Sequence, residues 1–506
     1  MKFFQNKANV ALLSAALSLY TLIAFNLPFF QHEVKLVDSN FNGFVLMATS
    51  VILLLALNFM FSYLLLKLCR FVGKCIISFT LIADAACLYL INNFNTLITD
   101  KMMGNFYNTQ MSEAGGFLCW AMVWQILLLG VLPSIYLFAR KVDYGSWKEF
   151  FKSIAIALGV ILAGVFGNMS NWPWIDRNST ELGSLVLPWS YTVNTYRYFD
   201  GERKKNVKEI LLPDARFTTD SRDICVLIIG ESTRRDHCSL YGYGKETNPY
   251  TAKDSVKAYI ANSSATYTIA GVKAILEPQP KKELYEILPN YLGRTGAEVL
   301  WRTNNWGEPP VKYGRYQKKG ELKKLYPEAD GAHDGILFEG LKEEMEACEK
   351  PKQFIVIHTY TNHGPAYYSN YPDEFEVFTP ACKTVEMSQA SQEEVFNAYD
   401  NSVVYMDWLI HSTIEAVKQI PASRRFVLFV SDHGESLGEG GLYMHGVPFS
   451  IAPKEQIEIP FIAWTDAPDL QFKDLPEVGQ HHVYHSVLHF FGVESEAYDP
   501  ALDIFE

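Results

Sequence analysis

The sequence predicts two domains, a transmembrane domain of five helices and then an α/β domain with a mostly parallel sheet covered by helices. Apolar residues crowd into roughly the first 175 positions, although the whole chain is only 49% hydrophobic. From residue 217 onward, short apolar runs alternate with stretches of helical pattern. We therefore expect a transmembrane domain over 1–170, a linker over 171–216 and a soluble domain over 217–506.

Five apolar stretches are each long enough to cross a bilayer, which takes about 20 helical residues. They cover 10–30, 43–66, 72–91, 117–139 and 150–169. Lysine and arginine concentrate before the first stretch and in every second connection, so the positive-inside rule places the N-terminus in the cytoplasm. Five crossings then place the soluble domain outside. Asp84 is the only ionisable residue well inside a span, so we expect a hydrogen bond within the bundle rather than a transport path.

The aromatic-rich segment 171–199 suits the boundary between lipid and water, where tryptophan and tyrosine gather. We expect it to lie on the outer membrane surface and to join the two domains.

In the soluble part, near-continuous apolar runs alternate with helical stretches. The runs are "ICVLIIG" (224–230), "AEVLWRT" (297–303), "QFIVIHTY" (353–360), "RRFVLFVS" (424–431) and "IPFIAWT" (459–465), and the helical stretches are 281–292, 335–347, 393–417 and 482–491. This alternation predicts a parallel sheet with both faces buried. Such sheets bind ligands at the carboxyl ends of their strands.

Metal-type ligands follow three of these strands. Glu231 ends the first, His363 comes shortly after the third, and Asp432 and His433 end the fourth. Carboxylates and imidazoles without thiolates suit Zn²⁺ or Mn²⁺ better than Ca²⁺. The sequence therefore predicts a metal site at this edge. We expect His358, inside a strand, and the histidines at 481, 482, 485 and 489 to be structural.

A transferase or hydrolase at such a site needs a hydroxyl beside the metal. Candidates are Ser232, Thr233, Ser263, Ser264, Thr266 and Thr268. The last four belong to "NSSATYTIAGVKAIL", which becomes helical after its hydroxyls, and a helix N-terminus is a good seat for phosphate. Ordinary helix capping by serine or threonine remains an alternative reading of this cluster.

The chain resembles the bacterial membrane phosphoethanolamine transferases of the alkaline phosphatase and sulfatase superfamily. The resemblance covers nearly the whole length and rests on motifs in the family's order: "VLIIGESTRRDHCSLYGYGKETNP" (226–249), "WRTNN" (301–305), "NHGPAYYSNYP" (362–372), "FNAYDNSVVYMD" (396–407) and "SDHGESLGEGGLYMHGVP" (431–448). It implies an alkaline-phosphatase/sulfatase-like soluble domain.

The resemblance also implies roles for single residues. Glu231, Asp432 and His433 would be zinc ligands, and Thr266 would be both a ligand and the nucleophile. His363 and His445 would contact the phosphoethanolamine group or a second zinc ion. In the loop "MMGNFYNTQMSEA" (102–114), Asn105, Thr109 and Glu113 stand four residues apart and would face the lipid head group. Asn304 and Asn305 are candidates to line the pocket.

The implied reaction moves phosphoethanolamine from phosphatidylethanolamine to lipid A or another lipopolysaccharide or glycan acceptor, through a phosphothreonine. The implied setting is a monomer in the bacterial inner membrane with a periplasmic catalytic domain, one or two zinc ions, and membrane lipids as partners. The nucleophile segment departs from the family pattern, because Ser264–Ala265 and Lys273–Ala274 stand where relatives have Cys–Gly and Pro–Cys. The disulfides of many relatives therefore cannot all be present.

Other functions fit less well. A glycerol-phosphate transferase, or a phosphoester hydrolase or sulfatase-type enzyme of the superfamily, is the main alternative, although no Cys-x-Pro-x-Arg stretch marks a formylglycine sulfatase. A non-catalytic binding protein and a transporter come next. The net charge of −12, with no basic stripe, argues against nucleic acid as a partner.

Overall fold

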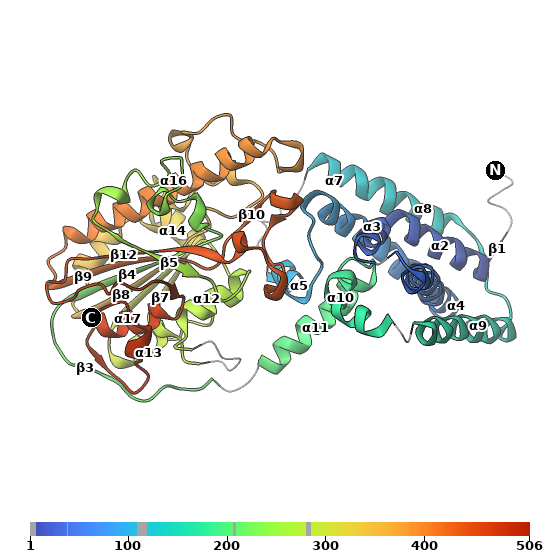
Figure 1. The fold of residues 1–506 in the computed structure, drawn as a ribbon, viewed down its shortest axis with the longest axis horizontal. Helices are drawn as coiled ribbons and strands as arrows, with labels where there is room; N and C mark the ends of the chain where they lie inside the picture. The colour runs from blue at the N-terminus through green and yellow to red at the C-terminus, as the bar shows by residue number, and fades with distance from the viewer. Residues whose placement is uncertain are drawn as a thin grey trace. The chain divides into compact units, whose positions relative to one another are not determined.

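The computed structural model describes residues 7–37, 39–108, 119–168, 171–205, 209–279, 285–385 and 387–506. The chain divides into two compact units, one reaching to Asp200 and the other running from Gly201 to the C-terminus. Each unit is described by itself (Figure 1).

The first unit is a bundle of apolar helices. Its elements are β1 (Ala8–Asn9), α2 (Val10–Phe25), α3 (Leu27–Leu36), α4 (Phe41–Phe94), α5 (Asp100–Asn108), α7 (Trp120–Gln125), the π-helical η1 (Ile126–Val131), α8 (Leu132–Ala139), β2 (Val142–Asp143), α9 (Trp147–Gly167), α10 (Trp172–Gly183) and α11 (Trp189–Lys205). Helices α10 and α11 occupy the segment expected to be a surface linker, and α10 as well as most of α11 belong to this unit.

The predicted number of five spans is not confirmed. Among the described residues, three helices are long and apolar enough to cross a membrane, or four if α2 and α3, bent by 62°, form one span. The difference arises at α4, whose 54 residues contain both the second and the third predicted stretch.

Helix α4 does not run straight. Arg70 leaves the helical region at φ 42° and ψ −101°. A Cβ added at Gly73 would lie 2.1 Å from the carbonyl oxygen of Leu65, whereas residues eight apart in a continuous helix are separated by about 12 Å along its axis. The chain therefore folds back near Arg70, and only glycine fits the close approach.

Asp84 makes the hydrogen bond that we expected within the bundle. The hydroxyl of Tyr191, in α11, donates to its Oδ1 at 3.0 Å. Asp84 is 1% exposed, so this contact gives a buried carboxyl group a polar partner.

The second unit is built on one eight-stranded sheet. Its strand order is β13-β5-β12-β9-β4-β8-β6-β7. The strands are β4 (Asp223–Gly230), β5 (Lys257–Asn262), β6 (Glu298–Thr303), β7 (Arg315–Lys318), β8 (Lys352–His358), β9 (Arg424–Ser431), β12 (Glu458–Thr465) and β13 (Val478–Gly479). Small two-stranded sheets pair β3 (Arg216–Phe217) with β14 (Val493–Glu494) and β10 (Ser436–Leu437) with β11 (Tyr443–Met444).

The sheet is mostly parallel, as predicted, with one exception in direction. Strands β7, β6, β8, β4 and β9 run parallel to one another, but β12 pairs antiparallel with both β9 and β5. The apolar run of β12 predicts a buried strand, and burial is the same in either direction.

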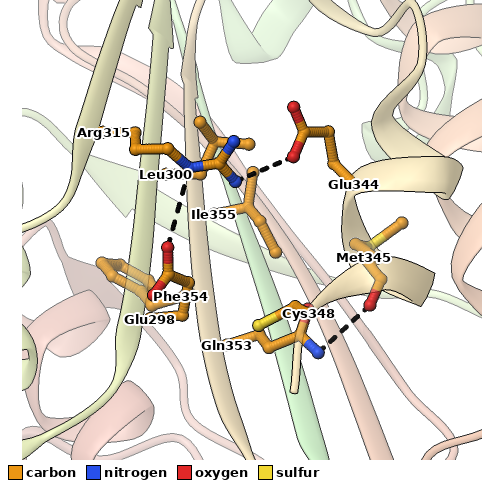
Figure 2. Close-up of a pocket in the computed structure, with 9 residues that line it drawn as sticks. All are labelled: Glu298, Leu300, Arg315, Glu344, Met345, Cys348, Gln353, Phe354 and Ile355. Atoms are coloured by element: carbon orange, nitrogen blue, oxygen red, sulfur yellow. Dashed lines mark hydrogen bonds and ion pairs between the residues drawn. The ribbon is translucent and has the colours of Figure 1, made fainter. Parts of the chain in front are cut away.

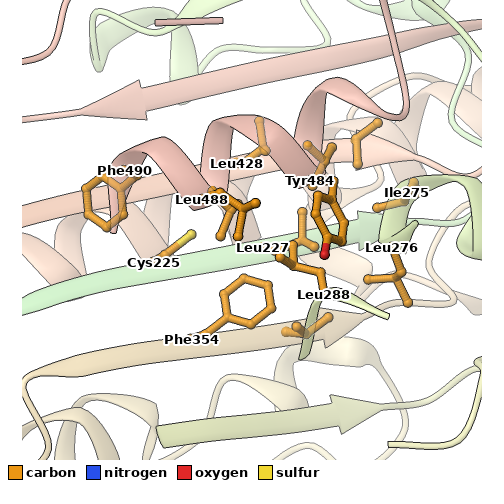
Figure 3. Packing of buried hydrophobic residues seen from close by; sticks show 14 of the residues in the cluster. Cys225, Leu227, Ile275, Leu276, Leu288, Phe354, Leu428, Tyr484, Leu488 and Phe490 are labelled. Carbon is orange, nitrogen blue, oxygen red and sulfur yellow. The ribbon is translucent and has the colours of Figure 1, made fainter. Parts of the chain in front are cut away.

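Helices cover both faces of the sheet (Figure 1). They are α12 (Thr268–Leu276), α13 (Leu288–Thr295), α14 (Lys319–Leu325), α15 (Leu341–Ala347), α16 (Gln392–Lys418) and α17 (His482–Phe490). Alternate residues of β4 enter different cores: Cys225 and Leu227 pack with α12, α13 and α17, while Ile224 and Val226 pack with α15 and α16. Figure 3 shows Tyr484 and Leu488 of α17 in one packed cluster with Leu227 and Leu428.

The register of the central strands sets the position of the site. Ile229 pairs with His358 and with Val430, and Gly230 pairs with Ser431. The residues that follow these positions leave the sheet side by side at its carboxyl edge.

Candidate active site

Two neighbouring strands deliver two carboxylates and an imidazole to one buried point. Glu231 follows β4, and Asp432 and His433 follow β9; all three side chains are 0% exposed. Nε2 of His433 lies 3.3 Å from Oε1 of Glu231 and 3.3 Å from Oδ2 of Asp432. The structure thus brings these three predicted ligands together.

The hydroxyl beside them belongs to Thr268, not to Thr266. Oγ1 of Thr268 donates to Oε2 of Glu231 at 3.2 Å and lies 3.4 Å from Nε2 of His433. Oγ1 of Thr266 instead donates to the carbonyl of Val447 at 2.6 Å. The structure therefore places Thr268 at the position where we expected Thr266. Both are buried threonines of one hydroxyl-rich segment, and only tertiary contacts distinguish them.

Helix α12 comes unusually close to the strand ends, and this approach positions Thr268 at its first turn. A Cβ at Gly271 would lie 2.2 Å from the carbonyl oxygen of Asp432. Only glycine permits this distance, and Gly271 stands one turn after Thr268 on the same helix face. The positive end of the helix is thereby aimed at the site.

Glu231 is held from several sides. Nδ2 of Asn305 donates to its Oε2 at 2.7 Å, and Oγ of Ser232 donates to its Oε1 at 2.8 Å. Asn305 is one of the two asparagines expected to line the pocket; the side chain of its neighbour Asn304 donates to Asp334 instead.

His445 and His363 lie next to this cluster. The ring centroid of His445 is 4.3 Å from that of His433 and 5.3 Å from that of His363. Nδ1 of His445 pairs with Oε2 of Glu435 at 2.7 Å, which fixes the orientation of the ring. Sequence reasoning did not single out Glu435, although it belongs to the quoted motif "SDHGES".

The electrostatics of the site follow from burial and close charges. Burial raises the pKa of Asp432, and repulsion by Glu231 adds to this, so that it reaches about 8. Burial lowers the pKa of His433, but the charges of Asp432 and Glu231 outweigh it and raise the value to about 10. Burial would raise the pKa of Glu231, yet the charges and hydrogen bonding of the histidines hold it well below its usual range.

His363 behaves differently from His433. Burial lowers its pKa to about 4, which favours the neutral imidazole.

The donor set fits a divalent cation. Oδ2 of Asp432 is buried and has no hydrogen-bond partner among the described residues. Ligand atoms of Glu231, His433 and His445 lie within 4.8 Å of one another, as do those of Glu231, His358 and Asp432. Two carboxylates and imidazoles without thiolates suit zinc.

His358 is closer to this cluster than its place in a strand suggested. It is the last residue of β8, and its Nδ1 pairs with Oε1 of Glu308 at 3.1 Å. Its Nε2 is buried without a hydrogen-bond partner among the described residues.

The residues expected to meet the lipid head group belong to another part of the chain. Asn105 lies in α5 of the first unit, and Thr109 and Glu113 lie outside the described residues.

A small surface pocket elsewhere is unrelated to the cluster. It is lined by residues at the amino ends of β6 and β8 and on α15, among them Glu298 and Gln353, whereas the ligands stand at the carboxyl ends (Figure 2). Across this pocket, Arg315 forms ion pairs with Glu344 at 2.8 Å and with Glu298 at 3.6 Å. The charged side chains that line the pocket therefore already pair with one another.

Comparison with known proteins agrees with this fold. Residues 224–493 match the family model "Sulfatase", and residues 53–203 match "Phosphoethanolamine transferase EptA/EptB". Phosphoethanolamine transferase EptA of Helicobacter pylori is 34% identical, over 96% of this chain and 95% of that protein.

Solved structures agree as well. The integral membrane protein lipooligosaccharide phosphoethanolamine transferase A (EptA) from Neisseria meningitidis superposes with a TM-score of 0.88 at 27% identity, covering 99% of both chains. The C-terminal periplasmic domain of phosphoethanolamine transferase EptC from Campylobacter jejuni covers 59% of this chain and 97% of its own, at 30% identity and a TM-score of 0.52.

The fold and the clustered ligands define an enzyme of the alkaline phosphatase and sulfatase superfamily. Within that superfamily, the chain belongs to the phosphoethanolamine transferase family, and it is a phosphoethanolamine transferase.

Proposed function

We propose that this transferase moves phosphoethanolamine from phosphatidylethanolamine to lipid A, or to another lipopolysaccharide or glycan acceptor, in a zinc-dependent reaction through a phosphothreonine at Thr268. The observation that carries the proposal is the position of Oγ1 of Thr268, 3.2 Å from Glu231 and 3.4 Å from His433, at the start of α12.

Glu231, Asp432, His433 and Thr268 would hold one zinc ion, with His445 and His363 beside it. When bound, the ion supplies Lewis acidity that lowers the pKa of a nearby hydroxyl and offsets negative charge at phosphorus. Oδ2 of Asp432 is buried and has no hydrogen-bond partner among the described residues, which supports a cation at this point.

The reaction has two balanced displacements. In the first, Oγ1 of Thr268 loses its proton and bonds to phosphorus, while the bond from phosphorus to the diacylglycerol oxygen breaks and that oxygen gains a proton. In the second, an acceptor oxygen loses its proton and bonds to the same phosphorus, and Oγ1 of Thr268 leaves and recovers a proton. In-line geometry and charge stabilisation carry most of such a reaction.

Residues of this chain serve both displacements. The positive end of α12 faces the phosphoryl oxygens. Glu435 holds Nδ1 of His445, so that Nε2 of His445 remains to bind a phosphoryl oxygen or to protonate the leaving oxygen. His363, favoured as neutral imidazole, accepts or donates a hydrogen bond there without adding charge.

The setting is the bacterial inner membrane, with the N-terminus in the cytoplasm and a periplasmic catalytic domain. Three observations support a membrane protein with a periplasmic domain: the apolar helices, the description of the Neisseria relative as an integral membrane protein, and the C-terminal periplasmic domain named for the Campylobacter relative. We propose five spans in a transmembrane domain over 1–170, a linker over 171–216 and a catalytic domain over 217–506, in a chain that acts as a monomer. Asn105, Thr109 and Glu113 would meet the donor head group. The relative's name supports lipooligosaccharide as the acceptor class.

The two threonines provide a matched test in vesicles that contain phosphatidylethanolamine with labelled ethanolamine and purified lipooligosaccharide. Thr268→Ala should lower transfer at least about a thousandfold, because the nucleophile is lost. Thr266→Ala should keep transfer near the wild-type rate, since it loses only a hydrogen bond to Val447, worth about 1 kcal/mol of stability.

Mass spectrometry then locates the intermediate and the product. Wild-type protein given the donor alone should carry phosphoethanolamine on the peptide that contains Thr268, and the complete mixture should yield modified lipid A. Label on Thr266, or an unmodified acceptor with free phosphoethanolamine released, would contradict the proposal and favour another nucleophile or a hydrolase.

A further inference from the structure

The segment that follows β6 contacts the active site twice. Asn305 donates to Oε2 of Glu231, and three residues later Glu308 pairs with His358. Glu308 lies outside the motifs that carry the family resemblance, and the proposed reaction gives it no role. Its side chain is 6% exposed, so a carboxylate has been buried here beside the site.

The contact between Glu308 and His358 determines which nitrogen of the imidazole carries the proton. Oε1 of Glu308 lies 3.1 Å from Nδ1 of His358, and the His358 side chain is 0% exposed. A carboxylate only accepts hydrogen bonds, so Nδ1 carries the proton and donates it to Glu308. The neutral ring then presents a lone pair at Nε2.

That lone pair has no hydrogen-bond partner among the described residues, yet it is fully buried. Its neighbours are carboxylates: ligand atoms of His358, Glu231 and Asp432 lie within 4.8 Å of one another. Oδ2 of Asp432 also lacks a hydrogen-bond partner in the described part of the chain. A buried acceptor that faces carboxylates is unfavourable unless a metal cation or a proton joins them. Burial lowers the pKa of His358, but hydrogen bonding to Glu308 and the charges of Glu308, Asp432 and Glu231 raise it overall, so this position attracts positive charge.

We propose that Glu308 is a positioning residue for the cation site: it holds His358 so that Nε2 faces the same ion as Glu231 and Asp432. A carboxylate behind a metal-facing histidine fixes its tautomer and ring orientation and increases its basicity. This inference rests on the proposed cation site and adds to it an imidazole and its support. Glu308 acts through His358 and touches no reacting atom.

Glu308 is itself fixed from the sheet. Tyr316 of β7 reaches Oε1 of Glu308 at 3.5 Å, and Trp301 packs edge-on against the His358 ring with centroids 6.4 Å apart. The pair is therefore preorganised rather than dependent on a flexible side chain.

The test measures zinc affinity of the full-length protein in detergent micelles, freed of metal and titrated against a chromophoric chelator. Glu308→Ala should weaken zinc binding about 10- to 100-fold, and Glu308→Gln should weaken it less, because the amide oxygen still accepts from Nδ1 but lacks the charge. His358→Gln should weaken binding as well. The double variant Glu308→Ala/His358→Gln should be no weaker than His358→Gln alone, since Glu308 acts only through that ring.

The control is Asp503→Asn, which alters another buried carboxylate paired with a histidine, His489, at the far end of α17. It should lower stability and leave zinc affinity unchanged. A second group of ligand-type residues, Asp254, His411 and Glu415, already contacts Lys418, so tight binding there is not expected.

Zinc affinity of Glu308→Ala within threefold of wild type would overturn the inference, as would fully additive losses in the double variant. Wild-type protein that binds no zinc would instead overturn the proposed cation site itself, so the two failures are distinguishable. Thermal unfolding of each variant separates a loss of affinity from a loss of fold.

Discussion

The two ends of the central sheet both bury charge, but they compensate it differently. At the amino end, Asp223 of β4 is contacted by Nζ of Lys352 and, at 2.7 Å, by Nη2 of Arg424. At the carboxyl end, Glu231 and Asp432 share one histidine, and Oδ2 of Asp432 is left without a hydrogen-bond partner among the described residues.

The difference identifies which end does chemistry. Strand register places Asp223 directly opposite Lys352 and Arg424, so the ion pairs at the amino end are completed by the sheet itself. At the carboxyl end the strand register pairs no lysine or arginine with Glu231 or Asp432, so the cation proposed above would complete the site. Incomplete compensation of buried charge, rather than buried charge as such, marks a functional site.

The largest effect on stability should come from the amino end. Asp223→Asn leaves Lys352, which is 1% exposed, with a buried and poorly paired ammonium group. We expect the free energy of unfolding of the second unit to fall by about 3–5 kcal/mol. Chemical unfolding in detergent micelles measures this.

The matched control at that end is Asp469→Asn, which removes the exposed second partner of Arg424. Surface ion pairs contribute about 0–1 kcal/mol, so this change should be small. Equal losses in the two variants would contradict the view that the amino end is a buried, internally completed ion cluster.

The carboxyl end should respond to metal instead. Zinc at about 100 times its dissociation constant should raise the free energy of unfolding of metal-free protein by about 2.7 kcal/mol, because it binds only the folded state. The increase should persist in Asp223→Asn and be lost in Glu231→Gln, which removes a ligand. Thermal unfolding with and without zinc tests this; an undiminished increase in Glu231→Gln would place the ion elsewhere.

The sequence predicted those parts of the fold in which a continuous apolar run also marks where the strand or helix ends. The strands ending at Glu231 and at Asp432 and His433 are continuous apolar runs, so both their burial and their end points could be read directly. Helix α16 was predicted to within a residue at each end, because it has a capping serine, Ser391, and a long apolar face.

The sequence did not decide features that depend on contacts across the fold. Thr266 and Thr268 differ by two residues in one segment, and the choice between them depends on which hydroxyl meets Glu231. His358 has the pattern of a strand residue, and only the register of β8 shows that it stands at the strand end. The direction of β12 likewise leaves no mark in hydrophobicity, whereas the reversal of α4 at Arg70 falls in the break between the predicted stretches 43–66 and 72–91.

A titratable group can also be buried in its neutral form, as His485 on α17 is. We expect the pH dependence of stability that it causes to be the smallest of these effects. Its Nε2 donates to the carbonyl of Pro278 at 3.0 Å, while its Nδ1 accepts from the backbone N–H of Asp499 at 3.0 Å. Burial lowers its pKa, although the nearby charges of Asp499 and Asp503 oppose this. Protonation would place a second proton on Nδ1 and break the bond from Asp499.

The sign of the pH effect follows from this arrangement. The unfolded chain takes up a proton at His485 near pH 6.5, whereas the folded protein resists it until lower pH. Its contribution to stability is therefore complete above about pH 6.5 and is lost as the pH falls through the folded pKa, with a slope of at most about 1.4 kcal/mol per pH unit.

His485→Gln can make both hydrogen bonds but cannot titrate, so it should flatten the loss of stability between pH 7 and about pH 5. Thermal unfolding of both proteins across that range provides the measurement. An unchanged pH profile would mean that acid destabilises the protein through other groups. His481 and His482 would then be replaced next, because burial lowers their pKa values as well.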